Sequence, residues 1–274
     1  MDKLESEKSK QAVILIIVHK EKLTIEEEAS LKQCYKILGN YKIVILSPEG
    51  LNINAYKDNI PVIEFDFIDP KWQSSYAMFN RLKILPFLYK RYQEYEYILF
   101  YELDAWVFKD DLAYWCDKGY DYIGAPWYDG YHNANEQSSF IGVGNGGFSL
   151  RNVKAHLKAL NSFSYIQSPF KLMLNYEWKH LKHPRNLLEI IYNFTIKNNT
   201  YYLFNNFNYN EDTFWGSICN QNFKWFKVPG KEIASQFSME MNAPKLFKQN
   251  ESLPFGCHGW YKHGKDFWSK HIKF

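Results

Sequence analysis

The sequence predicts an α/β fold with a mostly parallel, mixed sheet that is covered by helices on both faces. Runs of continuous hydrophobicity, such as residues 12–18 (AVILIIV) and 95–108 (YEYILFYELDAWVF), are typical of strands buried on both faces. Segments with helical spacing separate these runs, and this alternation indicates parallel strands joined by crossover helices. No internal repeat or low-complexity linker interrupts the pattern, so we expect a single domain over residues 1–274.

Size and composition narrow the class of protein. The 274 residues are 46% hydrophobic, which is enough to bury a large core. The net charge is +3, from 33 Lys and Arg against 30 Asp and Glu, and so small an excess gives no reason to expect a nucleic-acid partner. The aromatic content is high at 19%, and aromatic side chains fill cores more often than they stack on ligands.

Localisation is inferred from the cysteines and from the first hydrophobic run. The four cysteines form no C-x-x-C pair, which argues against a zinc knuckle or a dense disulfide framework and fits the reducing cytoplasm. Residues 12–18 are too few to span a membrane, and with the charged residues 1–10 before them they lack a signal-peptide cleavage site. We therefore expect a cytoplasmic protein without a transmembrane segment, whose contact with a membrane surface stays open.

The first half of the chain alternates strands and helices. Residues 12–18 form the first strand, and the following helix has Thr24 as its N-cap, Glu27 to complete a capping box and Gly39 just beyond its last apolar residue. Further buried strands are expected in YKIVILSP, stopped by its proline, and in PVIEFDF. Helical spacing over SSYAMFNRLKILPFLYKRY predicts a helix that is kinked or restarted at Pro86, before the strand in YEYILFY.

The second half is less regular. Short strands are expected in YDYIGAPW and GGFSLRN, followed by a helix in VKAHLKAL. Residues 162–210 are rich in aromatic residues and Asn, and the sequence pattern assigns them no fold. A helix entered through its acids in NEDTFWGSICN and a strand in KWFKV complete the pattern.

Two acids at the end of a buried strand suggest a metal site. Glu102 and Asp104 are separated by one residue, and side chains at i and i+2 of a strand share a face. The carboxyl ends of parallel strands are also where ligands bind in such sheets. Two carboxylates there suit a hard divalent cation such as Mn²⁺ or Mg²⁺. Spacing alone is equally compatible with two solvated acids.

Three later motifs have both a functional and a structural interpretation. The glycines of GNGGFSLRN allow a ligand to approach the backbone, or form a bulge or tight turn. The acids of NEDTFWG provide a catalytic base, or complement the dipole of a helix. In PFGCHGWYKHG we prefer His258 over His263 as a metal ligand, although a lone histidine is more often packed or solvent-facing.

The order of these motifs is more specific than any one of them. An Arg-bearing helix, an E-x-D pair, a glycine-rich strand, an E-D motif and a terminal His-Gly follow one another. This order resembles that of glycosyltransferases with the GT-A fold, including the glycogenin-like family. It is most similar to a family of predicted glycosyltransferases that share N-G-G-F-S-L-R and E-D-x-x-W patterns. The resemblance implies a Rossmann-like fold, a nucleotide-sugar donor and a Mn²⁺ or Mg²⁺ ion held by Glu102, Asp104 and His258.

The resemblance also implies how the donor is bound. It divides the chain into a nucleotide-binding half, about residues 10–110, and a half for the donor sugar and the acceptor, about residues 111–274. Arg81, or its neighbour Lys83, is expected to face the nucleotide or the diphosphate. The other expected donor-binding residues are His19 and Lys20 at the nucleotide base, and Asn145, Gly146 and Gly147 at the sugar.

The expected reaction is transfer of a sugar, with a UDP-sugar as donor and a glycan or another hydroxyl as acceptor, as in polysaccharide biosynthesis. Asp212 is the expected catalytic base of an inverting reaction, and Glu211 is expected to orient the donor or acceptor. Three alternatives stay open. The enzyme could be a retaining transferase of the same fold, a catalytically inactive carbohydrate-binding protein, or a nucleotidyltransferase, although no G-x-G-x-x-R-like loop follows the first strand.

Overall fold

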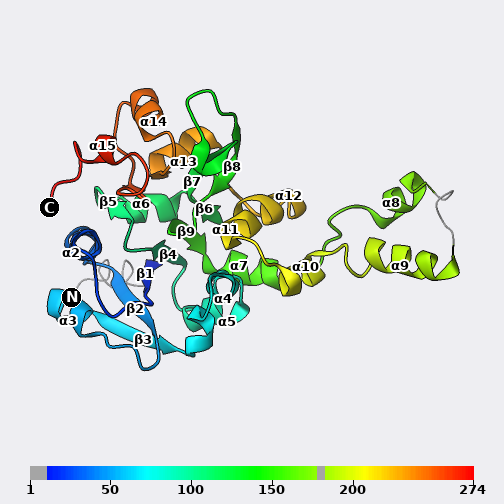
Figure 1. The fold of residues 1–274 in the computed structure, drawn as a ribbon, viewed down its shortest axis with the longest axis horizontal. Helices are drawn as coiled ribbons and strands as arrows, with labels where there is room; N and C mark the ends of the chain where they lie inside the picture. Colours follow the sequence, from blue (N-terminus) through cyan, green and yellow to red (C-terminus); the bar gives the residue numbers. More distant parts are fainter. Residues whose placement is uncertain (1–10, 178–182) are drawn as a thin grey trace.

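The computed structural model describes residues 11–177 and 183–274, and Figure 1 shows their arrangement. The expectation that the chain has no signal peptide depends partly on the charged residues 1–10, which lie outside the described residues. A central sheet is packed between helices, and two smaller sheets and the C-terminal helices lie above it in the view of Figure 1.

The central sheet has six strands in the order β3-β2-β1-β4-β9-β6. β1 pairs in parallel with β2 and β4, β2 pairs in parallel with β3, and β9 is antiparallel to both of its neighbours. This topology confirms the predicted α/β class with a mostly parallel, mixed sheet. The strands are β1 (Ala12–Ile17), β2 (Lys42–Pro48), β3 (Glu64–Ile68), β4 (Tyr97–Tyr101), β6 (Tyr122–Ile123) and β9 (Phe148–Asn152).

The two faces of this sheet are covered by different helices. Alternate residues of β1 point to opposite faces, so that Ile14 packs with Leu31 of α2, whereas Leu15 packs with Leu88 of α5. The helices of the first half and the one after β9 are α2 (Ile25–Leu38), α3 (Asn54–Asn59), the 3₁₀ helix η1 (Pro70–Gln73), α4 (Tyr76–Leu82), α5 (Pro86–Arg91), α6 (Leu112–Asp117) and α7 (Val153–Leu160). β1 is therefore buried on both sides, as its unbroken hydrophobicity predicts.

Several local signals in the sequence are confirmed. Thr24 and Glu27 form the capping box at the start of α2, and Gly39 is the C-cap of that helix. Pro86 is the first residue of α5, so the predicted helix is two helices separated by residues 83–85. The expected strand in KWFKV is wrong. Its residues form a turn and an extended stretch in which the Lys227 carbonyl accepts from Asp121 N, 2.9 Å away, and buried Phe226 anchors the segment in the core.

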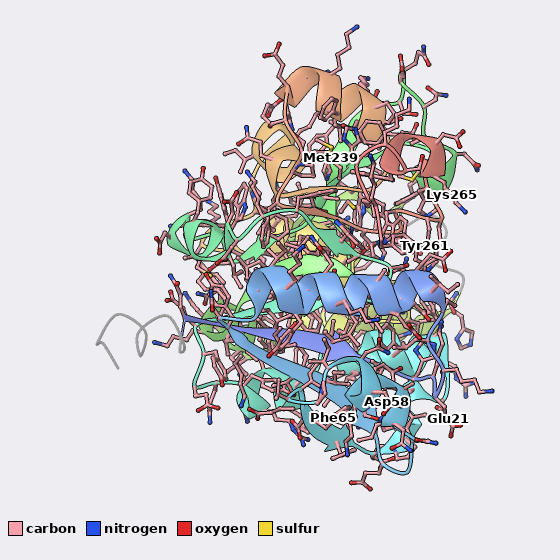
Figure 2. The ribbon with its side chains drawn as sticks, turned by 90° about the vertical axis from the view of Figure 1, so that its left-hand side faces the viewer. Glu21, Asp58, Phe65, Met239, Tyr261 and Lys265 are labelled. Carbon is pink, nitrogen blue, oxygen red and sulfur yellow. The ribbon has the colours of Figure 1, made fainter. Side chains whose placement is uncertain are left out.

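Two small sheets bring the end of the chain to the edge of the central sheet. β11 (Gly256–Cys257) pairs in parallel with β10 (Ser238–Met239) and antiparallel with β5 (Trp106–Val107), which directly follows the acid pair. β7 (Ala125–Tyr128) and β8 (Phe140–Gly144) form an antiparallel pair. In the view of Figure 2, α2 lies between the C-terminal elements near Met239 and the edge of the central sheet near Phe65.

The remaining helices include the region without a predicted fold. α8 (Pro169–Asn175) and α9 (Pro184–Phe194) extend away from the rest of the molecule beyond α10 (Thr200–Asn206) (Figure 1). The helix predicted at NEDTFWGSICN consists of α11 (Glu211–Thr213), the π-helical turn η4 (Phe214–Cys219) and α12 (Asn220–Asn222). The other helices are the 3₁₀ turn η2 (Tyr131–Asn133), α13 (Lys231–Phe237), α14 (Ala243–Asn250) and α15 (Lys265–Trp268).

Candidate active site

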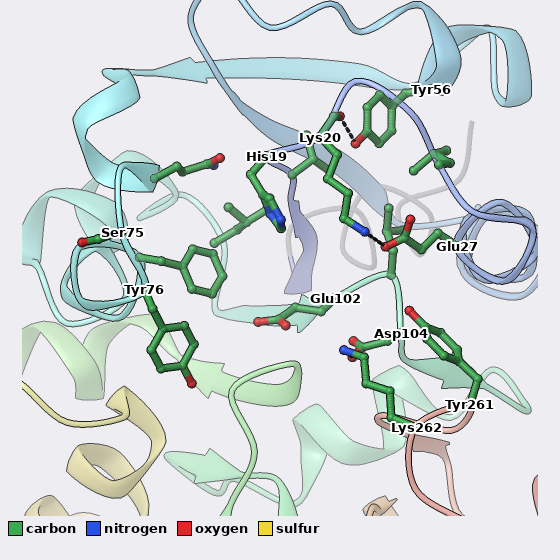
Figure 3. A pocket seen from close by; sticks show the side chains of 16 residues that line it. His19, Lys20, Glu27, Tyr56, Ser75, Tyr76, Glu102, Asp104, Tyr261 and Lys262 are labelled. Carbon is green, nitrogen blue, oxygen red and sulfur yellow. Dashed lines mark hydrogen bonds and ion pairs between the residues drawn. The ribbon is translucent and has the colours of Figure 1, made fainter. Parts of the chain in front are cut away.

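A cavity of about 460 Å³ opens at the carboxyl ends of β1 and β4. The strand order runs from β1 outward to β3 and returns to the other side of β1 at β4, so this boundary is a switch point of the kind where α/β sheets bind ligands. Figure 3 shows His19 and Lys20 on one side of the cavity and Asp104 and Lys262 on the other. The cavity therefore joins the nucleotide-binding half expected from the sequence to the end of the chain.

The two acids converge because of a turn rather than the pleat of a strand. β4 ends at Tyr101, and Ala105 N donates to the Glu102 carbonyl at 2.8 Å, which folds the acids into a tight turn. Glu102 N donates to the Gly147 carbonyl at 2.7 Å, so the turn is fixed against the start of β9. Glu102 and Asp104 are close to each other, as predicted. The predicted reason is wrong, because they lie in a turn and not on one face of a strand.

The third candidate metal ligand joins these acids. One ligand atom each from Glu102, Asp104 and His258 lies within 4.8 Å of the others. His258 Nε2 is buried and 3.0 Å from Asp104 Oδ1, but it is not aligned for a hydrogen bond. Nδ1 of the same ring lies 2.9 Å from Glu240 Oε1, which fixes its orientation. Two carboxylates and an imidazole whose Nε2 lies beside them are ligand types that suit a divalent cation such as Mn²⁺, which would replace the proton of this ring.

Cations surround the acid pair. Burial raises the pKa of Glu102, but Lys83 and His258 outweigh burial and lower it to about 2. Burial likewise raises the pKa of Asp104, and His258 and Lys262 outweigh it, so that the pKa falls below its ordinary value. The Lys262 ammonium lies 2.5 Å from Asp104 Oδ2. Both acids are therefore charged at neutral pH.

The two basic residues of the α4 segment point to different places. Lys83 is buried, with its ammonium 2.6 Å from Glu102 Oε1 and 3.6 Å from Glu211 Oε1. The Arg81 guanidinium donates to the Phe204 carbonyl of α10 and does not line the cavity. Its position on α4 directs Arg81 to the neighbouring helix, and the expected contact of Arg81 with the donor stays a prediction. Lys83 also lies outside the cavity lining and joins the acid pair to the E-D motif.

Glu211 is held inside the protein. Its carboxylate accepts from the buried guanidinium of Arg151 at 2.9 Å, and its backbone N donates to Asn80 Oδ1 at 3.0 Å. Together with Lys83 these contacts occupy a side chain that is 2% exposed. The carboxylate therefore faces protein cations, and its expected role of orienting a substrate stays a prediction.

Asp212 has a different environment from its neighbour. Its Oδ2 accepts from Asn145 N at 3.1 Å and its Oδ1 from Thr213 N at 2.9 Å. Burial and then the charge of Glu211 raise the pKa of Asp212 to about 7, although the hydrogen bond from Asn145 opposes this shift. A carboxyl group with this pKa can exchange a proton near neutral pH.

The glycine-rich segment packs against the functional side chains. Asn145 has a φ of 100°, and its Oδ1 accepts from Gly147 N at 2.9 Å. A Cβ on Gly146 would lie 2.3 Å from Glu211 Oε1, and one on Gly147 would lie 2.1 Å from His258 Nε2. The three residues do not line the described cavity. Their glycines are required for close packing of protein groups, a role that the motif alone did not reveal.

His19 and Lys20 line the cavity, and their expected contact with a nucleotide base stays a prediction. Lys20 pairs with Glu27 of the capping box, and the Tyr56 hydroxyl donates to the Lys20 carbonyl at 2.7 Å. Lys262 was not predicted from the sequence, although it follows His258 by only four residues. Glu240 was not predicted either, because nothing in the sequence around Glu240 links it to the histidine.

Residues 62–258 match the family described as "Protein of unknown function (DUF5672)". The chain belongs to this family. None of the curated proteins compared with the chain is significantly similar to it in sequence. No helix among residues 11–177 and 183–274 is both long and apolar enough to cross a membrane.

Among solved structures, the chain is similar to mouse xyloside xylosyltransferase 1 in its apo form, with 12% identity over 91% of this chain and 97% of that one and a TM-score of 0.47. The galactosyltransferase LgtC in complex with donor and acceptor sugar analogs shares 12% identity over 90% of this chain and 86% of that one, with a TM-score of 0.46. A glycosyltransferase involved in the glycosylation of the major capsid of PBCV-1 shares 10% identity over 90% and 92%, with a TM-score of 0.40.

Proposed function

We propose that this protein is a metal-dependent glycosyltransferase that moves a sugar from a nucleotide-sugar donor to a hydroxyl acceptor. The observation that carries this proposal is the convergence of Glu102, Asp104 and His258 at the edge of a cavity at the sheet's switch point. A cavity at this place suits a nucleotide, and an oxygen-rich cation site at its edge suits the diphosphate that follows the nucleoside.

The residues around the cavity fit an anionic donor. Glu102, Asp104 and His258 would hold a Mn²⁺ or Mg²⁺ ion, which supplies positive charge to the diphosphate leaving group. Lys20 and Lys262 add two ammonium groups to the cavity lining. Lys262 is bound to Asp104 in the structure, and an arriving phosphate oxygen would compete for the same ammonium group.

Asp212 is the proposed base of an inverting reaction. Its carboxylate takes the proton of the acceptor hydroxyl as the hydroxyl oxygen bonds to the anomeric carbon. The bond from that carbon to the donor phosphate breaks, and its electron pair leaves with the nucleoside diphosphate. A pKa of about 7 suits this role, because the group is ionised in a large fraction of molecules and still basic enough to accept a proton. Glu211 is unsuited to it, since Arg151 and Lys83 hold its carboxylate.

A ligand screen tests the proposal directly. UDP-sugars are the first donors to test, with GDP-sugars beside them, each with and without Mn²⁺. A ligand that binds the folded state raises the melting temperature, so a true donor should do so mainly when the metal is present. A donor that passes is then incubated with glycan acceptors, and transfer is followed by release of the nucleoside diphosphate. Absence of any metal-dependent shift across the panel would contradict the proposal.

A further inference from the structure

Residues 162–177 and 183–198 form an arm that leaves the body between α7 and α10 (Figure 1). Hydrogen bonds fasten its two chain segments together where they leave the body. Ile166 N donates to the Asn198 carbonyl at 3.1 Å, and the Asn198 side chain donates to the Gln167 carbonyl at 2.7 Å. Hydrogen bonds between its two segments therefore hold the arm together at its base, and α8 and α9 contact each other beyond it.

Few apolar side chains of the arm are covered by the arm itself. Ile190 of α9 is buried, and the rings of Phe194 and Tyr176 pack edge to face with centroids 5.8 Å apart. These contacts use only part of the apolar surface of the two helices. A helix that is hydrophobic on further faces normally has a second partner.

The remaining apolar side chains of these helices are exposed. Phe170 and Leu174, one turn apart on α8, are 69% and 65% exposed. On α9, Leu188 is 70% exposed, and Ile191 and Tyr192 follow it at helical spacing and are also exposed. Of the 22 large hydrophobic side chains that are exposed among the described residues, nine lie in the arm, which is a small part of the chain. Such a concentration marks an interaction surface.

The charge of this segment indicates what the surface binds. The sequence from 162 to 198 contains five Lys and Arg and two Glu, a net charge of +3. Two of these five, Lys179 and Lys182, lie outside the described residues, and the described arm has three basic and two acidic residues. Exposed apolar side chains with an excess of basic residues match an anionic lipid surface. A second copy of the arm would instead bring like charges together.

We propose that the arm docks on the surface of an anionic lipid bilayer. Its exposed leucine, isoleucine and aromatic side chains enter the boundary between headgroups and acyl chains, while its basic side chains stay among the lipid phosphates. Only residues 207–210 separate α10 at the base of the arm from Glu211 in α11. Docking would therefore hold the E-D motif close to the membrane. The proposal does not depend on glycosyl transfer.

Vesicle binding of the full chain tests this proposal. The probes are vesicles of phosphatidylcholine alone and of phosphatidylcholine mixed with phosphatidylglycerol. The arm variant is Leu188→Gln with Ile191→Gln, and the control is Ile25→Gln with Val62→Gln, which removes two side chains of the body that are 75% and 69% exposed. The wild type and the control should sediment with the anionic vesicles, less so at high salt, and the arm variant should bind about tenfold more weakly.

Three outcomes would overturn the proposal. The wild type could fail to bind anionic vesicles, or the arm variant could bind them as well as the wild type does. The third outcome is that the control loses as much vesicle binding as the arm variant. A dimer in analytical ultracentrifugation that the arm variant alone dissolves would assign the surface to a second copy instead. Unchanged melting temperatures of both variants would show that the fold is intact, as their exposed positions predict.

Discussion

Negative charge on the acidic side chains is stabilised at one end of the candidate site and disfavoured at the other. At one end, Lys83, Lys262 and the ring of His258 keep Glu102 and Asp104 ionised. At the other end, Asp212 accepts only backbone hydrogen bonds among the described contacts, and its pKa rises to about 7. The comparison teaches that the first end keeps two carboxylates charged at any physiological pH, as a cation site needs, and that the second end is suited to moving a proton.

Removal of Asp104 should have the largest effect. Asp104→Ala deletes one of the two carboxylates of the proposed metal site and removes the partner of Lys262, so sugar transfer should fall below detection while the melting curve stays cooperative. Donor-dependent release of nucleoside diphosphate is the measurement, with Asp58→Ala, an exposed acid of α3, as the control. Glu102→Ala should be milder than Asp104→Ala. Near-normal turnover of Asp104→Ala would remove the distinction between the two ends.

Asp212→Asn should lower the transfer rate by roughly 10²–10⁴, because the amide keeps the size of the side chain but cannot act as a base. Donor affinity should be unchanged. The melting temperature at pH 8 should change little, because relief of the buried charge offsets the loss of one of the two backbone hydrogen bonds that the carboxylate accepts. The anomeric configuration of the product, read by NMR, is the second measurement. Retention together with a fully active variant would favour the retaining alternative.

Glu211→Gln tests whether Glu211 has a different role from Asp212, the other acid of the E-D motif. It leaves the buried Arg151 and Lys83 with one negative partner fewer, so the free energy of unfolding should fall by about 3 kcal/mol. Urea unfolding of Glu211→Gln and Asp212→Asn in parallel gives the comparison. If Glu211→Gln is stable and loses only its transfer rate, the roles of the two acids are exchanged.

His258→Ala should raise the Mn²⁺ concentration for half-maximal activity by about 100-fold or more, since it removes one of the three proposed ligands and loss of an orienting partner alone typically costs about 10–100-fold. Glu240→Gln should act in the same direction but less strongly, because Glu240 only orients the ring. His263→Ala is the matched control from the same loop and should leave the Mn²⁺ requirement unchanged. A larger effect at His263 than at His258 would show that the wrong histidine was chosen.

The pH dependence of the transfer rate should reflect the protonation of Asp212. The base must be deprotonated to act, so the rate should fall as pH drops through about 7, approaching tenfold for each further unit. Binding of Mn²⁺ should also weaken as pH falls, so the rates are measured at saturating Mn²⁺. Burial lowers the pKa of His258, but Asp104 and the neighbouring acids raise it above its ordinary value, and the ring must lose a proton to bind the metal. In Asp212→Asn this decline in rate should be absent.

Local signals predicted the framework well, because each depends on neighbours in sequence. The capping box of Thr24 and Glu27 and the helix start at Pro86 are settled within one turn. The convergence of Glu102, Asp104 and His258 was predictable only through the order of motifs, since β11 brings the histidine across from the end of the chain.

Features that depend on packing between distant segments were not predictable. Nothing in the run from Arg81 to Lys83 tells which cation turns inward, because the choice depends on the positions of Phe204 and Glu211 in later segments. KWFKV has the composition of a strand, but the hydrogen bonds of Lys227 with Asp121 fix it as a connection. The arm was also unassigned, since its apolar residues do not all face a core.

The tight contact between Gly147 and the ring of His258 has an evolutionary consequence. The space that a Cβ would need is occupied by Nε2 of the histidine, so neither position can change freely while the other is kept. In related chains the two should covary, with glycine retained wherever the histidine is present. A relative that has lost the histidine is released from this constraint and can accept alanine at the glycine position, so the pair would identify members of the family that lack this proposed metal ligand.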